Sequence, residues 1–321
     1  MSENGGEGMR RLRLAYRDND RTPVIYCIRE MARRYYDIDV EVLRIPGTQE
    51  YEDALFNGSC DVIIEHLEYL YAYAEKPGAK KVTMFCAPRL KRGLDLVVSS
   101  HINGPEAFKG KTMAVRGSGR PHSIMLWLRM MGLEKDVKMV IVGDDEVGRW
   151  GQWKKVASGE CVATFMDPLY RPQALAGGLK VLQVPDLPVI GHYSQACLAK
   201  FGRDQHDLMS DYVRAVIHAL CLMRFRKEDA LGIASKEPMQ LMKIADMKEM
   251  ERQFDCIVRD LEVRPYPTPE AMAMTYEISK LEYGAKEINP FTLWDWHWIK
   301  DLDDQGFIDR LIKEMSPAKQ S

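Results

Sequence analysis

Short apolar segments alternate with amphipathic segments over most of the chain. Residues 60–64 (CDVII) and 112–115 (TMAV) are typical of buried strands, whereas the apolar residues that follow His122 recur at helical spacing. Strands and helices in alternation indicate an open, mostly parallel sheet of the α/β class. After Asp204 helical spacing prevails, with many methionines that we expect in the core. Strands are predicted at 11–16, 40–45, 60–64, 82–86, 94–99, 112–115, 138–142, 161–165, 179–184 and 189–199, and helices at 23–36, 48–57, 67–75, 151–158 and from His122 onward.

The composition is that of an ordinary globular protein large enough for two domains. The chain has 321 residues, of which 46% are hydrophobic and 29% charged, so it can build substantial cores. Its formal net charge of -2 argues against nucleic acid or an anionic membrane surface as a partner. No uncharged run reaches the length of a transmembrane helix, so membrane insertion is not expected. Self-association into a homo-oligomer stays open at this level.

The cysteines and the N-terminus both favour a cytoplasmic protein. Seven cysteines are scattered and never form a CxxC pair, which favours reduced thiols over a disulfide framework or a zinc site. Residues 1–16 are polar and pass directly into a predicted strand, without the apolar core of a secretory signal. We therefore expect the protein to work in the cytoplasm.

The stretch 111–133 has the local features of an anion-binding site. Its predicted strand leads through the loop RGSGRP (116–121) into the helix that begins at His122. A helix N-terminus after a glycine-containing loop presents unpaired N–H groups and favours an anion, and Arg116 and Arg120 are placed to fork onto a carboxylate. The loop matches neither the P-loop nor GxGxxG, so a nucleotide is not indicated. The competing interpretation is a plain strand-to-helix connection with solvated arginines.

Three segments resemble recurring stretches of the type 2 periplasmic-binding-protein fold superfamily. They are 57–64 (NGSCDVII), 105–119 (PEAFKGKTMAVRGSG) and 156–168 (VASGECVATFMDP). The resemblance implies a two-lobed α/β fold with an interdomain cleft and a helical C-terminal tail. It implies a first, discontinuous domain at 1–95 plus 195–321 and a second domain at 96–194.

Ligands of open α/β sheets bind outside the carboxyl ends of the strands, so the candidate site is formed by the residues that follow strand ends and by those where the chain crosses between the two domains, His192 and Tyr193. Here those residues are rich in arginine, histidine and carboxylates, and histidine titrates near neutral pH. The candidate catalytic residues are His66, His192, Glu65 and Asp20. The candidate substrate-binding residues are Arg17, Asp18, Asn19, Arg116, Ser118, Arg120, His122, Asp167 and Tyr193. Arg21 belongs to the same run of strand-end residues, without an assigned role.

Further segments resemble the 4,5-dihydroxyphthalate decarboxylase family. They are 14–22 (LAYRDNDRT), 85–93 (FCAPRLKRG), 102–115 (INGPEAFKGKTMAV), 124–132 (IMLWLRMMG) and 187–200 (LPVIGHYSQACLAK). The resemblance implies a cofactor-independent decarboxylase that acts on a small aromatic or cyclic carboxylate. In such an enzyme arginines would hold a retained carboxylate, and a histidine would protonate the ring carbon. No HExxH or similar ligand spacing supports a metal, although a divalent metal stays open because histidines and carboxylates share the predicted cleft.

Each candidate residue also has a purely structural interpretation. Asp18 and Asp20 would be ordinary caps of the following helix. Glu65 and His66 would form a first helical turn, and His192 would be a satisfied core histidine. The competing function is a receptor for nitrate, a sulfonate, taurine or an aromatic acid that feeds an ABC transporter. That function requires export from the cytoplasm.

Overall fold

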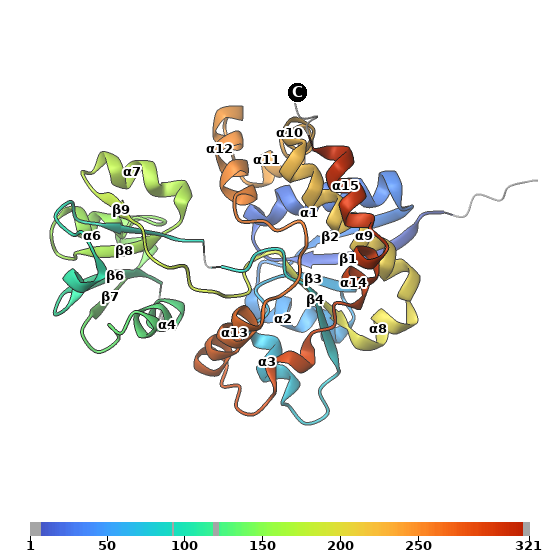
Figure 1. Ribbon diagram of the computed structural model, residues 1–321, viewed down its shortest axis with the longest axis horizontal. Helices are drawn as coiled ribbons and strands as arrows, with labels where there is room; N and C mark the ends of the chain where they lie inside the picture. The colour runs from blue at the N-terminus through green and yellow to red at the C-terminus, as the bar shows by residue number, and fades with distance from the viewer. Residues whose placement is uncertain (1–7, 92, 118–121, 317–321) are drawn as a thin grey trace, which may run out of the picture. The chain divides into compact units, whose positions relative to one another are not determined.

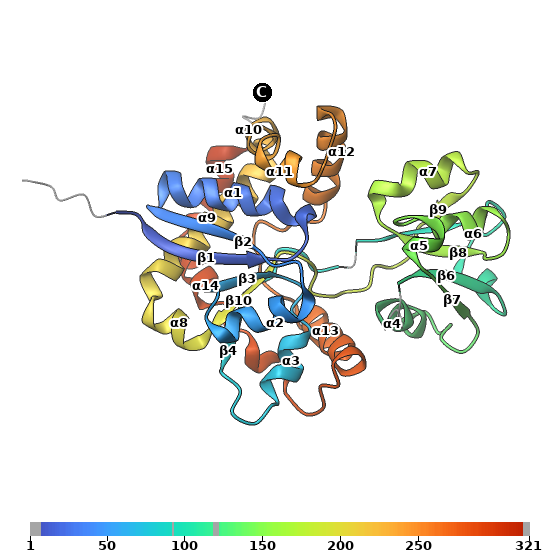
Figure 2. The same cartoon turned by 180° about the vertical axis from the view of Figure 1, so that it is seen from behind.

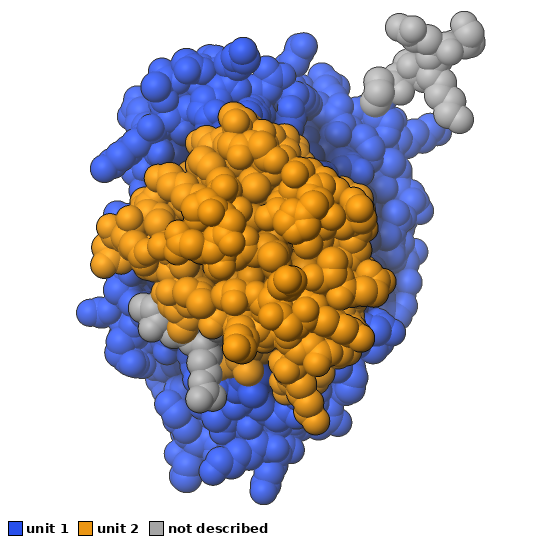
Figure 3. All heavy atoms as spheres, turned by 90° about the vertical axis from the view of Figure 1, so that its left-hand side faces the viewer, with its two compact units in different colours: residues 1–90, 190–321 blue, residues 91–189 orange. Residues whose placement is uncertain are grey.

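The chain forms two compact units, each built around its own β-sheet (Figure 1). The computed structural model describes residues 8–91, 93–117 and 122–316. The first unit, unit 1, comprises Met1–Leu90 and Ile190–Ser321, and unit 2 comprises Lys91–Val189 (Figure 3). The domain limits expected from the sequence, at 95 and 194, stand slightly beyond these boundaries.

The sheet of unit 1 is parallel on one side and antiparallel on the other. In order across the sheet, its strands are β2 (Ile38–Arg44), β1 (Arg10–Tyr16), β3 (Val62–Glu65), β10 (Ser194–Leu198) and β4 (Val82–Cys86). β1 runs parallel to β2 and β3, with Leu14 opposite Val62. β10 pairs antiparallel with β3 and β4, which sets Ser194 opposite Glu65. The parallel strands therefore end at one edge, and the polar residues that follow β1 and β3 lie along it.

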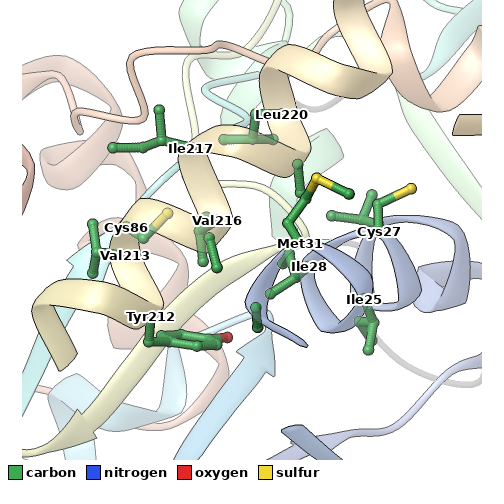
Figure 4. Close-up of a cluster of buried hydrophobic side chains, with 14 of the residues drawn as sticks. Ile25, Cys27, Ile28, Met31, Cys86, Tyr212, Val213, Val216, Ile217 and Leu220 are labelled. Carbon is green, nitrogen blue, oxygen red and sulfur yellow. The ribbon is translucent and has the colours of Figure 1, made fainter. Parts of the chain in front are cut away.

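Alternation along these strands supplies two apolar faces, and helices cover both (Figure 2). Helices α1 (Thr22–Tyr35) and α9 (His206–Phe225) cover one face, and α2 (Thr48–Asn57), α3 (Tyr69–Ala74) and α13 (Pro269–Glu282) cover the other. Leu12 and Leu14 of β1 enter the first core, while Ala15 enters the second. Figure 4 shows the first core, where Ile28 of α1 and Val216 of α9 lie together. The sheet, whose edge carries the polar residues, is thus packed between two layers of helices.

The C-terminal region is helical, as the spacing of its apolar residues predicts. Met209, Met223 and Met250 are buried in the first core. Across the described residues, no helix combines the length and apolar character needed to span a membrane. All seven cysteines are described, and none forms a disulfide. The remaining helical elements of unit 1 are η1 (Asn19–Arg21), α8 (Ala199–Asp204), α10 (Lys227–Ala234), α11 (Glu237–Leu241), α12 (Met247–Val258), η4 (Pro290–Leu293), α14 (His297–Asp304) and α15 (Phe307–Met315).

The sheet of unit 2 is also mixed. In order across the sheet, its strands are β7 (Lys138–Val142), β6 (Thr112–Arg116), β8 (Ala163–Met166), β5 (Asp95–Val98) and β9 (Lys180–Leu182). β6 runs parallel to β7 and β8, whereas β5 is antiparallel to β8 and β9. Val97, Ala114 and Met166 are fully buried in its core. Its helical elements are η2 (Pro105–Phe108), α4 (His122–Met130), α5 (Asp144–Val147), α6 (Trp153–Ala157), η3 (Pro168–Tyr170) and α7 (Arg171–Ala176).

Some predicted elements are shorter than the apolar pattern suggests. The strand expected at 189–199 begins only at Ser194. The reason is Tyr193, whose φ of 74° takes the backbone out of the extended region before the strand starts. The helix expected at 151–158 is reduced to the single turn and a half of α6, since a turn precedes it.

Candidate functional site

A group of charged and polar side chains lies where β1 and β3 of unit 1 end. The turn η1 follows β1 and carries Asp20 and Arg21, and Glu65 is the last residue of β3. His66 follows in the loop before α3, so the alternative interpretation of Glu65 and His66 as a first helical turn is wrong. His192 lies just before β10, the strand that pairs with β3. We call these five residues the Arg21–Glu65 cluster.

Arg21 is a buried cation held by two carboxylates. Its side chain is 6% exposed, and Nη1 lies 2.5 Å from Oδ2 of Asp20. Its Nε and Nη2 donate to Oε1 of Glu65 at 3.1 and 3.0 Å. Burial works to lower the pKa of Arg21, but the carboxylates of Asp20 and Glu65 outweigh it, and the pKa is raised. Burial also works to raise the pKa of Glu65, yet Arg21, His66 and Arg17 together lower it, so the pair is ionised at neutral pH.

The imidazole of His192 contacts both members of this pair. Its Nδ1 lies 2.5 Å from Nη2 of Arg21 and 3.0 Å from Oε1 of Glu65. Arginine can only donate a hydrogen bond, and an ionised carboxylate can only accept one. A neutral ring protonated at Nε2 therefore accepts from Arg21, whereas a ring protonated at Nδ1 donates to Glu65. The position of the proton on His192 therefore decides which of the two partners it binds.

His66 completes the cluster and packs against His192. The two ring centroids are 3.7 Å apart, with the planes tilted by 55°. Nδ1 of His66 lies 3.3 Å from Oε1 of Glu68, whose side chain is buried. The side chains of His66 and His192 are 25% and 27% exposed, against 1% for Glu65. Together with Asp20, these imidazoles are the groups of the cluster that a small ligand can reach.

Two oxygens of the cluster have no hydrogen-bond partner among the described residues. They are Oδ1 of Asp20 and Oε2 of Glu65, and both are shielded from solvent. A buried acceptor left without a partner costs on the order of 1–3 kcal/mol, so such an atom calls for an explanation in a bound group or ion. One candidate ligand atom from each of Glu65, His66 and His192 lies within 4.8 Å of the other two. Those three residues are the ones in this cluster that could hold a metal.

Tyr193 anchors the segment that carries His192. Its side chain is buried, and its hydroxyl lies 3.5 Å from the backbone oxygen of Asp20. The guanidinium carbon of Arg21 lies 5.7 Å from the centre of its ring. A positive φ in an aromatic residue costs on the order of 1–3 kcal/mol and persists only where the surroundings impose it. Tyr193, predicted to bind substrate, is buried beside Asp20 and Arg21 and holds the segment that precedes β10.

The residues around η1 do not act as helix caps. Arg21 occupies the N-cap position of α1, and no side chain caps this helix. Asp18 lies 3.6 Å from Arg17 across an exposed pair, which leaves both side chains partly accessible. The side-chain amide of Asn19 donates to the backbone oxygen of Leu241 at 2.7 Å, so it serves packing against α11.

Arg116, predicted to hold a ligand carboxylate, is already paired within unit 2. Its Nε donates to Oδ1 of Asp144 at 2.7 Å, and its Nη2 donates to the other oxygen. The guanidinium carbon lies 4.6 Å from the centre of the Trp150 ring. The hydrogen bond to Asp144 raises the pKa of Arg116, and the same bond lowers the pKa of Asp144. A ligand anion would have to share Arg116 with Asp144 or displace Asp144 from it. Nothing in the sequence indicates this pairing.

The other predicted residues of unit 2 follow the strands or begin the helices of its sheet edge. Asp167 caps η3, because its Oδ1 accepts from the backbone N–H of Leu169 at 2.9 Å. His122 is the first residue of α4. Ser118 and Arg120 lie outside the described residues.

A small, mainly apolar pocket lies in unit 2 beside the first turn of α4. Trp127 and Phe165 meet edge to face there, with ring centroids 4.9 Å apart. The indole N–H of Trp127 donates to the backbone oxygen of Pro185 at 2.9 Å, which holds the pocket wall. The lining residues are Leu94, Ser123, Ile124, Trp127, Phe165 and 184–187. No feature of the sequence marked this pocket, because its residues come from four separate segments.

Comparison of the fold with solved structures identifies its class. The sequence matches no protein-family model and no curated protein. The periplasmic sulfonate-binding protein SsuA of Methylobacillus flagellatus KT is similar with a TM-score of 0.67 and 17% identity, covering 98% of this chain and 99% of that one. The periplasmic aliphatic sulphonate-binding protein SsuA of Escherichia coli is similar with a TM-score of 0.60 and 17% identity, covering 85% of this chain and 87% of that one. The periplasmic nitrate-binding protein NrtA of Synechocystis PCC 6803 is similar with a TM-score of 0.57 and 14% identity, covering 98% of this chain and 92% of that one.

The chain thus has the type 2 periplasmic-binding-protein fold, as its sequence segments suggested. Identities of this size establish the fold alone. The cytoplasmic location expected from the N-terminus is contradicted, because these neighbours are periplasmic proteins. The similarity to the decarboxylase family remains a prediction from sequence.

Proposed function

We propose that this protein binds a small organic anion as the substrate-binding component of an ABC importer and works in the periplasm. The supporting observation is the cluster at the carboxyl edge of the unit 1 sheet, where ligands of open α/β sheets bind. Two partly exposed imidazoles lie there on a buried Arg–Glu pair. The similar solved structures bind sulfonate or nitrate.

The chemistry of the cluster in unit 1 fits a ligand with an anionic group. Imidazole N–H groups and guanidinium groups are hydrogen-bond donors that suit the oxygens of a sulfonate or carboxylate. The apolar pocket beside α4 suits an alkyl or aromatic group. Nitrate has no organic group, so within the proposed class of organic anions we favour sulfonates and aromatic carboxylates.

Calorimetric titration of the full chain with nitrate, ethanesulfonate, taurine, benzoate and phthalate tests this proposal. We expect saturable binding of a sulfonate or aromatic acid at one site. The variant His192→Ala should weaken that binding, whereas His206→Ala, which removes an exposed imidazole of α9, should leave it unchanged. Absence of binding to every anion of the panel would reject the proposal.

A second candidate function is cofactor-independent decarboxylation of a hydroxylated aromatic acid. The observation that favours it is the contact of His192 with both Arg21 and Glu65, because a neighbouring carboxylate can orient an imidazole that acts as a general acid. In that reaction the bond from the ring to the carboxylate breaks, its electron pair stays on the ring carbon, and an imidazolium delivers the proton there. Incubation with dihydroxylated benzoates and phthalates, followed by NMR of the product, tests it. Tight binding without release of CO₂ would leave the receptor as the function.

A further inference from the structure

We propose that Glu65, His66 and His192 form a binding site for a divalent transition-metal ion of the Zn²⁺ type. Their candidate ligand atoms lie within 4.8 Å of one another at the end of β3 and the start of β10. Two imidazole nitrogens and one carboxylate oxygen are a donor set that suits Zn²⁺, Co²⁺ or Fe²⁺, whereas Mg²⁺ and Ca²⁺ prefer oxygen alone. This site goes beyond the proposed function and does not depend on it.

The free oxygen of Glu65 is the first independent support. Arg21 occupies Oε1, while Oε2 is buried without a hydrogen-bond partner among the described residues. Because the side chain of Glu65 is 1% exposed, this oxygen has little access to bulk water, and a small ion bound there would supply the missing partner. Arg21 then acts on the opposite oxygen and orients the carboxylate, as a hydrogen-bonded neighbour of a metal ligand does.

The charge of the surroundings is the second support. In and around the cluster lie two guanidinium groups, those of Arg17 and Arg21, and four carboxylates, which leaves an excess of two negative charges while the imidazoles are neutral. The carboxylates are those of Asp18, Asp20, Glu65 and, beside His66, Glu68. A divalent cation would cancel this excess. Arg21 opposes cation binding by its own charge, but its Nη1 and Nη2 are already bound to two of these carboxylates.

Only small rotations are needed to bring the ligand atoms together. Bonds of about 2.0–2.2 Å to a tetrahedral ion set its ligand atoms about 3.4 Å apart, against separations of up to 4.8 Å here. Both imidazoles are partly exposed, so they have room to turn, while Glu65 is fixed by Arg21. The exposed side of the histidines leaves a place for water or for an anionic ligand on the ion.

Titration of the chelator-treated full chain with Zn²⁺, in a buffer free of organic anions, tests the site. We expect one equivalent of Zn²⁺ to bind, with affinity lower by about tenfold or more in both His66→Ala and His192→Ala. The matched control is His206→Ala, because His206 is exposed and stacks on His297 with ring centroids 5.7 Å apart. Binding that is absent, that survives both cluster variants or that is lost in the control would overturn the proposal.

Co²⁺ provides a measurement on the unmodified chain, which is decisive even where a variant does not fold. When one equivalent of Co²⁺ is added to the protein, its visible spectrum should differ from that of the hydrated ion. The difference is expected because nitrogen ligands and a lower coordination number change the absorption of Co²⁺. Glu65→Gln keeps the shape of the side chain and removes its charge, and should abolish the change. A spectrum identical to that of hydrated Co²⁺ would refute the site. Because no anion is present, the result is independent of the proposed function.

Discussion

Both units place an arginine–carboxylate pair at the carboxyl edge of their sheets, yet the two pairs differ in burial. In unit 1 the side chains of Arg21 and Glu65 are 6% and 1% exposed. In unit 2 those of Arg116 and Asp144 are 34% and 38% exposed. Water solvates the second pair and barely reaches the first, so the same chemistry has different consequences. The buried pair keeps its two partners together and lies within hydrogen-bonding distance of His192, whereas water competes with Asp144 for Arg116 in the exposed pair.

The largest effect is expected from removing one partner of the buried pair. Glu65→Ala leaves Arg21 buried with Asp20 as its remaining carboxylate, which should destabilise unit 1 by about 3–5 kcal/mol. Urea denaturation followed by tryptophan fluorescence measures the loss. A loss below about 1 kcal/mol would mean that water reaches Arg21 as freely as it reaches Arg116, and the contrast between the units would disappear.

A second prediction concerns the buried His218 of α9, which should make the stability of unit 1 sensitive to acid. Burial lowers the pKa of His218 to about 4 from the ordinary value of 6.5. Between these two values the unfolded chain binds a proton at His218 and the folded chain does not. The free energy of unfolding is therefore unaffected by this histidine above pH 6.5 and decreases as the pH falls from 6.5 to 4. By linkage the loss is roughly 3 kcal/mol.

Denaturation curves measured across this pH range test the assignment. His218→Gln should flatten the dependence of the unfolding free energy on pH between 6.5 and 4. His101→Gln, in unit 2, serves as a control for the loss of an exposed imidazole. A slope that persists unchanged in His218→Gln would place the titrating group elsewhere.

Ligand affinity tests the exposed pair of unit 2. If Arg116 exchanges Asp144 for a ligand anion, Arg116→Ala should weaken binding by about 1.5–3 kcal/mol, the range for hydrogen bonds to charged groups. Arg129→Ala is the matched control, because Arg129 makes a two-bonded pair with Glu134 on the surface of the same unit. Equal affinity in Arg116→Ala and the parent chain would remove Arg116 from the site.

The smallest effect is expected from the carboxylate of the exposed pair. Asp144→Ala should change the stability by less than about 1 kcal/mol, because both side chains are solvated and the pair is screened by salt. It should leave Arg116 available and therefore strengthen anion binding rather than weaken it. Calorimetric titration of this variant with the ligand identified for the parent chain measures the effect. Weaker binding in Asp144→Ala would show that Asp144 orients Arg116 for the ligand.

The sequence by itself determined the α/β class, the two sheets and the edge of unit 1 where polar residues gather. Apolar periodicity carries this information because each strand and helix must bury one face, and polar residues at strand ends follow from the same pattern. Asp20, Glu65 and His66 were identified in this way, whereas His192 was expected from the crossing between the two domains. The strand limits near Tyr193 were not, because a single backbone angle imposed by packing ended the extended run.

Only the tertiary structure decided how these residues are paired. Arg21 and Glu65 are far apart in the chain, and their contact with His192 depends on β10 returning beside β3 after the whole of unit 2. The pairing of Arg116 with Asp144 likewise depends on the neighbouring positions of β6 and β7. Residue type gives the charge of a side chain, but its partner and burial are set by long-range packing. Burial is what makes one arginine a fixed support and leaves the other open to solvent.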